Sequence, residues 1–247
     1  MKTILTLALS LAFSGLAVAA GGHGPELEKA HVDITDKASL QRGARVFVNY
    51  CMGCHSLNFM RYNRLGQDLG LSDDQVLQNL VFDDAKIGQT MTNAMPEGRA
   101  ANWFGKTPPD LSVIARARGA DWLNGFLKGY YLDPGKPTGM NNTVFRDVGM
   151  PHPLWALQGT RNAVFHEERD AEGNARQVFD RFETVAEGRL TPKEYDRTVR
   201  DLVNFLVYVG EPSALERRAL GPYVIAFLLL FTLLAYFLKK EYWRDVH

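Results

Sequence analysis

The chain contains two cysteines, and they stand three residues apart in the run Cys51-Met52-Gly53-Cys54-His55. At a helix end this spacing puts both side chains on one face, close enough for their sulfurs to meet the two vinyl groups of one haem. The histidine that follows can place an imidazole nitrogen beneath the iron. Cys-x-x-Cys-His is the pattern of covalent c-type haem attachment, so it predicts one covalently bound haem c.

Other kinds of site also use a Cys-x-x-Cys pair, and the rest of the chain argues against each of them. A redox dithiol is typically part of a thioredoxin-like alternation of strands and helices, which the sequence around Cys51 does not show. A structural zinc site needs four ligands. The chain has no further cysteine and no closely spaced pair of histidines to complete such a site.

Residues 1–20 have the features of a secretory signal peptide. Lys2 supplies a basic start, residues 4–12 are mostly apolar, and the segment ends in an Ala-Val-Ala cleavage pattern. We expect cleavage after position 19 or 20; without cleavage the same stretch would be an N-terminal anchor. Export agrees with haem attachment, because bacteria mature c-type cytochromes on the outer side of the inner membrane.

A second apolar segment, residues 219–238, has no charged side chain. Twenty residues of helix span about 30 Å, the thickness of the hydrocarbon core of a bilayer. Tyr223 and Tyr236 near its ends are typical of the membrane interface. We expect residues 211–218 to be a linker and residues 239–247 to be a short cytoplasmic tail. Together with the signal peptide, this arrangement predicts a single-pass protein of the bacterial inner membrane with its main domain in the periplasm.

The exported part, residues 21–210, is long enough for one compact domain. The formal net charge of the whole chain is zero, which gives no reason to expect nucleic-acid binding. Helix caps and apolar spacing indicate a mainly helical fold, and partial alternation of apolar and polar residues around Gly173 predicts one β-hairpin. The expected helices are 37–50 capped by Asp36, 72–81, 111–118 capped by Asp110, 121–130 and 191–209, and the expected strands lie within 164–167 and 177–185.

The second face of the iron decides what such a haem does. With one protein ligand a haem can bind small molecules, whereas two strong ligands make it an electron carrier, and methionine as the second ligand raises the reduction potential. Met150 is the favoured candidate, because the proline after it favours an extended backbone and a rigid strap. Met95 also precedes a proline, and His152 and His31 are rival ligands. The other methionines of the exported part, which can simply fill the core, are Met52, Met60, Met91 and Met140.

Two arginines, Arg116 and Arg118, lie beside apolar residues on the expected helix 111–118. A planar guanidinium can pair bidentately with a carboxylate, and haem carries two propionates. Either arginine can therefore meet a propionate or simply lie on a solvated helix face.

Several further motifs accompany the haem motif and the C-terminal span. They are Pro-Pro-Asp-Leu-Ser at 108–112, Ala-Arg-Ala-Arg-Gly at 115–119, Gly-Tyr-Tyr at 129–131, Asn-Asn-Thr-Val-Phe at 141–145 and Val-Gly-Met-Pro-His at 148–152. Together with the haem motif and the span, these runs resemble the bacterial cytochrome c1 family over essentially the whole mature chain.

The resemblance implies a mainly α, enlarged class I cytochrome c-like haem domain with a small β-hairpin and one C-terminal transmembrane helix. In that fold the first and last soluble helices, here 37–50 and 191–209, cross near the haem. The site residues that the resemblance implies are Cys51 and Cys54 for attachment, His55 and Met150 for the two faces of the iron, Arg118 near a propionate and Trp122 beside the haem.

The resemblance also implies a function, that of an electron-transfer subunit of quinol–cytochrome c oxidoreductase, the bc1 complex, and not of an enzyme on its own. The subunit takes one electron from the Rieske iron–sulfur protein and passes it to a periplasmic cytochrome c. Cytochrome b is a further partner, and the complex is expected to be dimeric. The alternatives are a haem enzyme or gas sensor with an open iron site, and a cytochrome subunit of another membrane oxidase or reductase.

Overall fold

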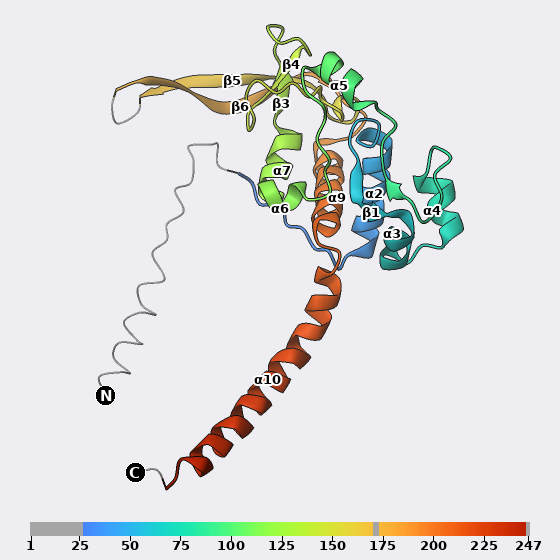
Figure 1. The fold of residues 1–247 in the computed structure, drawn as a ribbon. Helices are drawn as coiled ribbons and strands as arrows, with labels where there is room; N and C mark the ends of the chain where they lie inside the picture. Colours follow the sequence, from blue (N-terminus) through green and yellow to red (C-terminus); the bar gives the residue numbers. More distant parts are fainter. Residues whose placement is uncertain (1–26, 170–172, 246–247) are drawn as a thin grey trace.

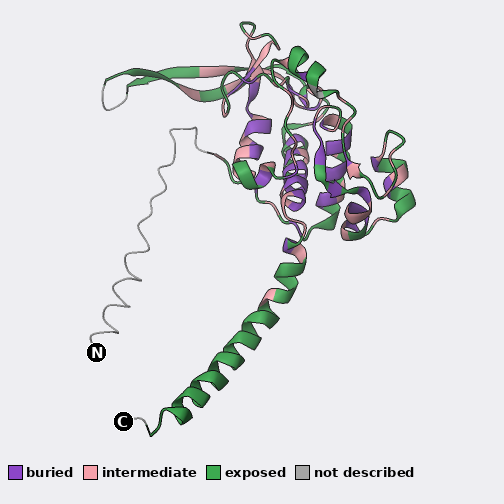
Figure 2. Cartoon of the chain, viewed as in Figure 1, coloured by how far each residue is buried: buried purple, intermediate pink, exposed green. Residues whose placement is uncertain are grey.

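The computed structural model describes residues 27–169 and 173–245. The expected signal peptide lies outside the described residues. A helical domain occupies the centre of the molecule, a long helix leaves it at one end, and a β-hairpin projects from it near the other end (Figure 1). Buried residues are concentrated on the helices of the central domain (Figure 2).

Two helices, α2 (Lys37–Tyr50) and α9 (Pro192–Gly210), lie side by side at the centre of this domain (Figure 1). Both begin at the caps that the sequence predicts. The Asp36 side chain accepts a hydrogen bond from the backbone of Ser39, and Thr191 forms a reciprocal capping box with the third residue of α9. Because α2 and α9 lie in contact with each other, the expected pairing of the first and last soluble helices is confirmed.

The crossing of α2 and α9 depends on Gly43. A Cβ atom at this position would lie 2.1 Å from the Asp201 carbonyl oxygen and 2.6 Å from Phe205 Cβ, so only glycine permits the approach. Beside it, the buried Asp201 carboxylate accepts hydrogen bonds from Ser39 Oγ at 2.7 Å and from Arg42 Nε at 2.6 Å. These bonds compensate the carboxylate for the loss of water and tie the two helices together.

Shorter helices surround the central pair. They are α3 (Tyr62–Leu69), α4 (Asp73–Leu80), α5 (Glu97–Phe104), α6 (Ile114–Arg118), α7 (Ala120–Lys128) and α8 (Trp155–Gln158). Helix α4 starts at the predicted capping box of Ser72 and Gln75, whereas α3, α5 and α8 have no counterpart among the expected helices.

Two expected helix boundaries are wrong. The helix expected over 111–118 begins at Ile114, and Asp110 is not its cap. The Asp110 carboxylate instead accepts hydrogen bonds at 2.8 Å from the backbone N–H groups of Asn58 and Ser112, and so joins two segments distant in the chain. The helix expected over 121–130 ends at Lys128, because the chain turns at Gly129 and pairs as a strand.

Over residues 27–169 and 173–245, three antiparallel strand pairs complete the domain. They are β1 (Leu57–Arg61) with β2 (Thr90–Met91), β3 (Tyr130–Leu132) with β4 (Met140–Asn142), and β5 (Gly159–Arg169) with β6 (Ala175–Glu187). The last pair is the predicted hairpin, with longer strands than expected, and it aligns Phe165 with Phe179. Their rings pack edge to face, with centroids 6.1 Å apart.

Helix α10 (Ala214–Tyr242) leaves the domain and, after its first residues, is exposed along most of its length (Figure 2). It contains the whole expected span 219–238 but begins at Ala214, so most of the expected linker 211–218 is helical. A stretch of 29 residues with a mean hydropathy of 2.1 in its most apolar part fits a membrane span. Arg64 in α3 pairs with Glu216 at 3.2 Å and connects the start of this helix to the domain.

Candidate haem-binding site

A cavity of about 490 Å³ opens between the end of α2, the segment 104–111, helices α6, α7 and α9, and the segment 148–153. This volume lies within the range of roughly 300–1,000 Å³ that is usual for cofactor sites. Most of the lining is aliphatic or aromatic, and within the described residues it contains no acidic side chain. Lys106 and Arg118 are its cationic members. The cavity is thus suited to a large apolar group that carries negative charges at its edge.

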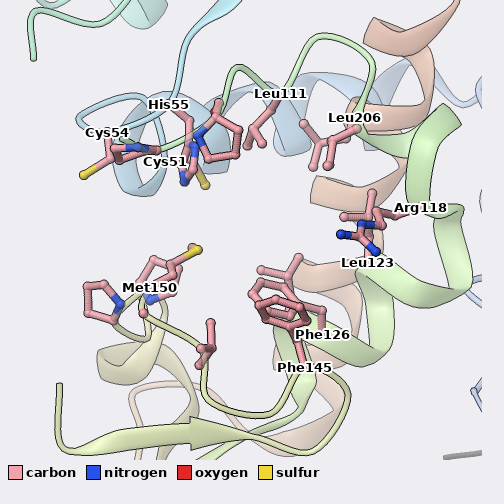
Figure 3. A pocket seen from close by; sticks show the side chains of 18 of the residues that line it. Cys51, Cys54, His55, Leu111, Arg118, Leu123, Phe126, Phe145, Met150 and Leu206 are labelled. Carbon is pink, nitrogen blue, oxygen red and sulfur yellow. The ribbon is translucent and has the colours of Figure 1, made fainter. Parts of the chain in front are cut away.

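Both cysteines lie on one wall of this cavity (Figure 3). Helix α2 ends at Tyr50, and the chain then turns tightly, with the N–H groups of Cys54 and His55 donating to the Cys51 carbonyl at 3.0 and 2.9 Å. Both thiols are free. Burial raises the pKa of Cys51 to about 12 and also raises the pKa of Cys54. A redox dithiol needs a lowered thiol pKa, so these values count against that alternative.

The imidazole of His55 is buried and has a defined orientation. Its Nδ1 lies 2.8 Å from the Pro109 carbonyl oxygen, which can only accept, so Nδ1 carries the proton. Nε2 therefore has the free lone pair that a metal ligand needs. Burial lowers the pKa of His55, which keeps the ring neutral and able to ligate. The Pro109 contact links positions 54 residues apart in the chain, and no sequence pattern indicates it.

Met150 lies on the opposite wall, with its sulfur directed into the cavity toward the wall that carries His55 (Figure 3). Val148, Gly149, Pro151 and Pro153 line the same wall. We call residues 148–153 the Met150 strap. It has no regular secondary structure, as expected for a segment with two prolines.

The other candidate ligands lie elsewhere. Within the described residues, Met150 is the methionine that lines the cavity, whereas Met60 and Met91 are buried in the core and the Met52 sulfur accepts a hydrogen bond from Tyr62. His31 lines a separate polar groove beside α9. The His152 ring is not in the cavity lining; its Nε2 bonds to Gln158 Oε1 at 2.7 Å, and burial lowers its pKa to about 4. Met95 and Met140 are also outside the lining.

The structure brings Arg118 and Trp122 together at one side of the cavity. The guanidinium carbon of Arg118 lies 5.1 Å from the centre of the Trp122 ring, and this ring stacks on Phe126 with centroids 5.0 Å apart. Arg118 points into the cavity (Figure 3). Arg116 does not line the cavity and instead pairs with Glu211 at 3.2 Å. Of the two arginines, only Arg118 is in a position to meet a carboxylate in the cavity.

Comparison with known proteins agrees with this geometry. A family model described as the cytochrome C1 family matches residues 28–246. The chain belongs to the cytochrome c1 family. It is 50% identical to a cytochrome c1 of Allochromatium vinosum, over 98% of this chain and 99% of that protein. It is 28% identical to a mitochondrial cytochrome c1 heme protein of Schizosaccharomyces pombe, over 85% of this chain and 68% of that one.

A relative with another name matches over the full length. The chain is 45% identical to a protein of Nitrosomonas europaea named ammonia monooxygenase gamma subunit, over 100% of both chains. Membership of the cytochrome c1 family confirms the predicted fold class and implies a haem c cofactor and a place in respiratory electron transport. The cavity, its donor groups and its cationic edge fit such a haem.

Proposed function

We propose that this protein carries single electrons from the Rieske iron–sulfur protein to a periplasmic cytochrome c, as the membrane-anchored haem subunit of a bc1 complex. Membership of the cytochrome c1 family supports the electron-transfer role. A relative in Bradyrhizobium diazoefficiens is named cytochrome b/c1, and it supports cytochrome b as a direct partner. We expect α10 to span the membrane beside that partner in a dimeric complex, with the haem domain in the periplasm.

One observation carries this proposal: His55 and Met150 face each other across an apolar cavity (Figure 3). A haem bound there supplies an iron that takes up and releases one electron. With His55 and Met150 as its two protein ligands, such an iron would have no position for a substrate, so the protein would move electrons without making bonds. Apolar walls exclude water, and a rigid ligand pair keeps the geometry similar in both redox states.

Cys51 and Cys54 are proposed to hold the haem covalently. Each thiol would form one thioether with a vinyl group of the haem, by net addition of its S–H across the double bond. The two sulfurs lie on the same wall as His55 (Figure 3), which agrees with attachment beside the proximal ligand. The pKa of each thiol is raised, so both are protonated at neutral pH, the form from which a thioether would be made.

Arg118 and Trp122 are proposed to hold the haem edge. The Arg118 guanidinium can pair with a propionate, while Trp122, stacked on Phe126, supplies an apolar surface beside the ring. Lys106 is a second cation in the lining. Positive charge near the haem favours the reduced state, so replacing Arg118 by glutamine is expected to lower the midpoint potential.

The test is Met150→Leu, with Met60→Leu as the matched control, because Met60 is a fully buried core residue outside the cavity lining. We expect Met150→Leu to lower the midpoint potential of the c-type haem and to let carbon monoxide bind its reduced form. Met60→Leu should change neither property. If Met150→Leu matches the wild type in both, Met150 is not the ligand. If the unchanged protein already binds carbon monoxide rapidly, the haem has an open site and the electron-carrier proposal is wrong.

The relative from Nitrosomonas europaea supports a second candidate, a subunit of a monooxygenase complex. The subunits that co-purify with the full-length protein decide between the two. Isolation with cytochrome b and a Rieske protein supports the bc1 assignment. Isolation with monooxygenase subunits, or with a terminal oxidase and no Rieske protein, contradicts it.

A further inference from the structure

Tyr130 lies directly behind the Met150 strap and is almost completely buried, with 1% of its surface exposed. Its hydroxyl donates a hydrogen bond to the Met150 carbonyl oxygen at 3.3 Å. Its ring stacks on that of His152, with centroids 4.4 Å apart and planes 5° from parallel. The Tyr130 side chain thus contacts both the main chain of Met150, through its hydroxyl, and the side chain of His152, through its ring.

The strap needs such support because of its composition. Pro151 and Pro153 have no N–H group, so this segment has fewer donors than an ordinary loop to satisfy carbonyl oxygens. The strap begins after Asp147, whose N–H donates to Asn141 Oδ1 at 2.8 Å. Asn141 belongs to β4, the strand that pairs with the strand of Tyr130. Strands β3 and β4 therefore hold the strap at two places, at its start and at Met150.

Tyr130 is itself held firmly. Its backbone pairs with Asn142 in β4, and its carbonyl oxygen accepts from Arg161 Nε at 3.0 Å. Its ring meets Phe126 edge to face, with centroids 5.5 Å apart, and Phe126 lines the cavity. A residue whose main chain and ring are both held by the core can keep the strap at a fixed distance from that core.

We propose that Tyr130 is a positioning residue for Met150, which holds the strap against the cavity and so keeps the sulfur bound to the iron. This inference rests on the proposed role of Met150 as a ligand. It adds that the strength of ligation depends on a hydroxyl and a ring outside the cavity. Without them the strap moves outward more often, and the sixth position opens for part of the time.

The test is Tyr130→Phe in the intact complex, which removes the hydroxyl and keeps the ring. Tyr195→Phe is the matched control: Tyr195 is also buried, and its hydroxyl donates at 2.9 Å to the carbonyl of Leu127 in α7 and not to the strap. The control loses a shorter and more deeply buried hydrogen bond than Tyr130→Phe does, so a general loss of stability affects it at least as much.

We expect carbon monoxide to bind the reduced haem of Tyr130→Phe faster than wild type, by at most about fivefold, because fivefold corresponds to one ordinary hydrogen bond and this one is long. The midpoint potential should fall, and the sulfur-to-iron charge-transfer band of the oxidised protein should weaken. Tyr195→Phe should match the wild type in all three. If the two variants behave alike in these measurements, or if Tyr130→Phe matches the wild type, Tyr130 has a structural role only.

A second variant covers the case in which Tyr130→Phe does not mature. His152→Leu removes the ring that stacks on Tyr130, together with its hydrogen bond to Gln158, and leaves the tyrosine in place. Gln158→Leu loses the same hydrogen bond but keeps the stacked rings, so it is the control. Faster carbon monoxide binding in His152→Leu than in Gln158→Leu supports the proposal, and equal rates overturn it. Rapid carbon monoxide binding by the wild-type protein would contradict the proposal that Met150 is a ligand. It is therefore distinguishable from a failure of the Tyr130 proposal, in which only the variants give an unexpected result.

Discussion

The replacement of Gly43 by alanine tests the central helix crossing most directly. In an exposed helix this change is favourable by about 1 kcal/mol, because alanine has the higher helix propensity. At Gly43 the new methyl group would lie 2.1 Å from the Asp201 carbonyl oxygen and 2.6 Å from Phe205 Cβ. Ordinary contact distances between such atoms are about 3.5–4.0 Å. Helices α2 and α9 must therefore separate by more than an ångström or bend.

The magnitude follows from the atoms that the methyl group meets. One is backbone and the other is the first atom of a fully buried side chain, so neither can move alone. Overpacking of a close-packed core typically costs about 1–3 kcal/mol, and a contact this short belongs at or above the top of that range. After subtraction of the propensity gain, we expect a net loss of about 2 kcal/mol. For a chain of this size that corresponds to a melting temperature lower by about 4–8 °C.

The assay is thermal unfolding of the full-length protein in detergent, followed by far-ultraviolet circular dichroism and by haem absorbance. Gly98→Ala is the matched control, because Gly98 also lies in a helix, α5, and a Cβ there meets nothing within 4 Å. The control should be neutral or stabilising by up to about 1 kcal/mol. If Gly43→Ala is as stable as the wild type or as Gly98→Ala, then the close approach of α2 and α9 is not what holds the domain together.

Two further predictions concern single interactions. Thr191→Ala removes the capping box at the start of α9 and should lower the free energy of unfolding by about 1 kcal/mol in urea titrations, whereas Thr191→Ser should not; equal effects would contradict the cap. The Asp121 carboxylate accepts from the Ala30 N–H at 2.8 Å and from Lys29 at 3.1 Å, which lowers its pKa below 3.8. Because the folded pKa is the lower one, its contribution is complete above about pH 4 and is lost as pH falls through the folded pKa. The stability difference between wild type and Asp121→Asn should therefore shrink below pH 3.8, and a constant difference would refute this account.

Interactions within a few residues were predictable from the sequence, and the helix starts illustrate this. Asp36 and Thr191 cap α2 and α9 as expected, because a cap bonds to a backbone group only two or three residues away. Asp110 is also an aspartate just before an expected helix, yet one of its carboxylate oxygens accepts a hydrogen bond from the backbone of Asn58, 52 positions earlier. A partner so distant in the chain competes with the local cap, and the local pattern carries no sign of it.

The features of the site fall into the same two groups, those that depend on neighbouring residues and those that depend on distant ones. The attachment motif, the neighbouring histidine and the membrane span depend on residue spacing and composition, so they could be recognised from the amino acids alone. The orientation of His55 depends on the Pro109 carbonyl, 54 positions away, and Tyr130, whose hydroxyl bonds to the Met150 carbonyl, lies 20 positions earlier in the chain. The role of Met150 as a ligand was a prediction from a short motif and a resemblance, and it stays a prediction that the Met150→Leu variant tests.

What the sequence determined by itself is the chemistry that the chain can perform: a Cys-x-x-Cys-His run, a methionine before a proline, and one segment apolar enough to cross a membrane. The tertiary structure decided which of several methionines and arginines face one cavity, and what holds them there. The physical reason is distance along the chain. Spacing and capping act within one or two helical turns, whereas the walls of the cavity come from segments far apart in the chain, from the end of α2 to residues 148–153 and α9.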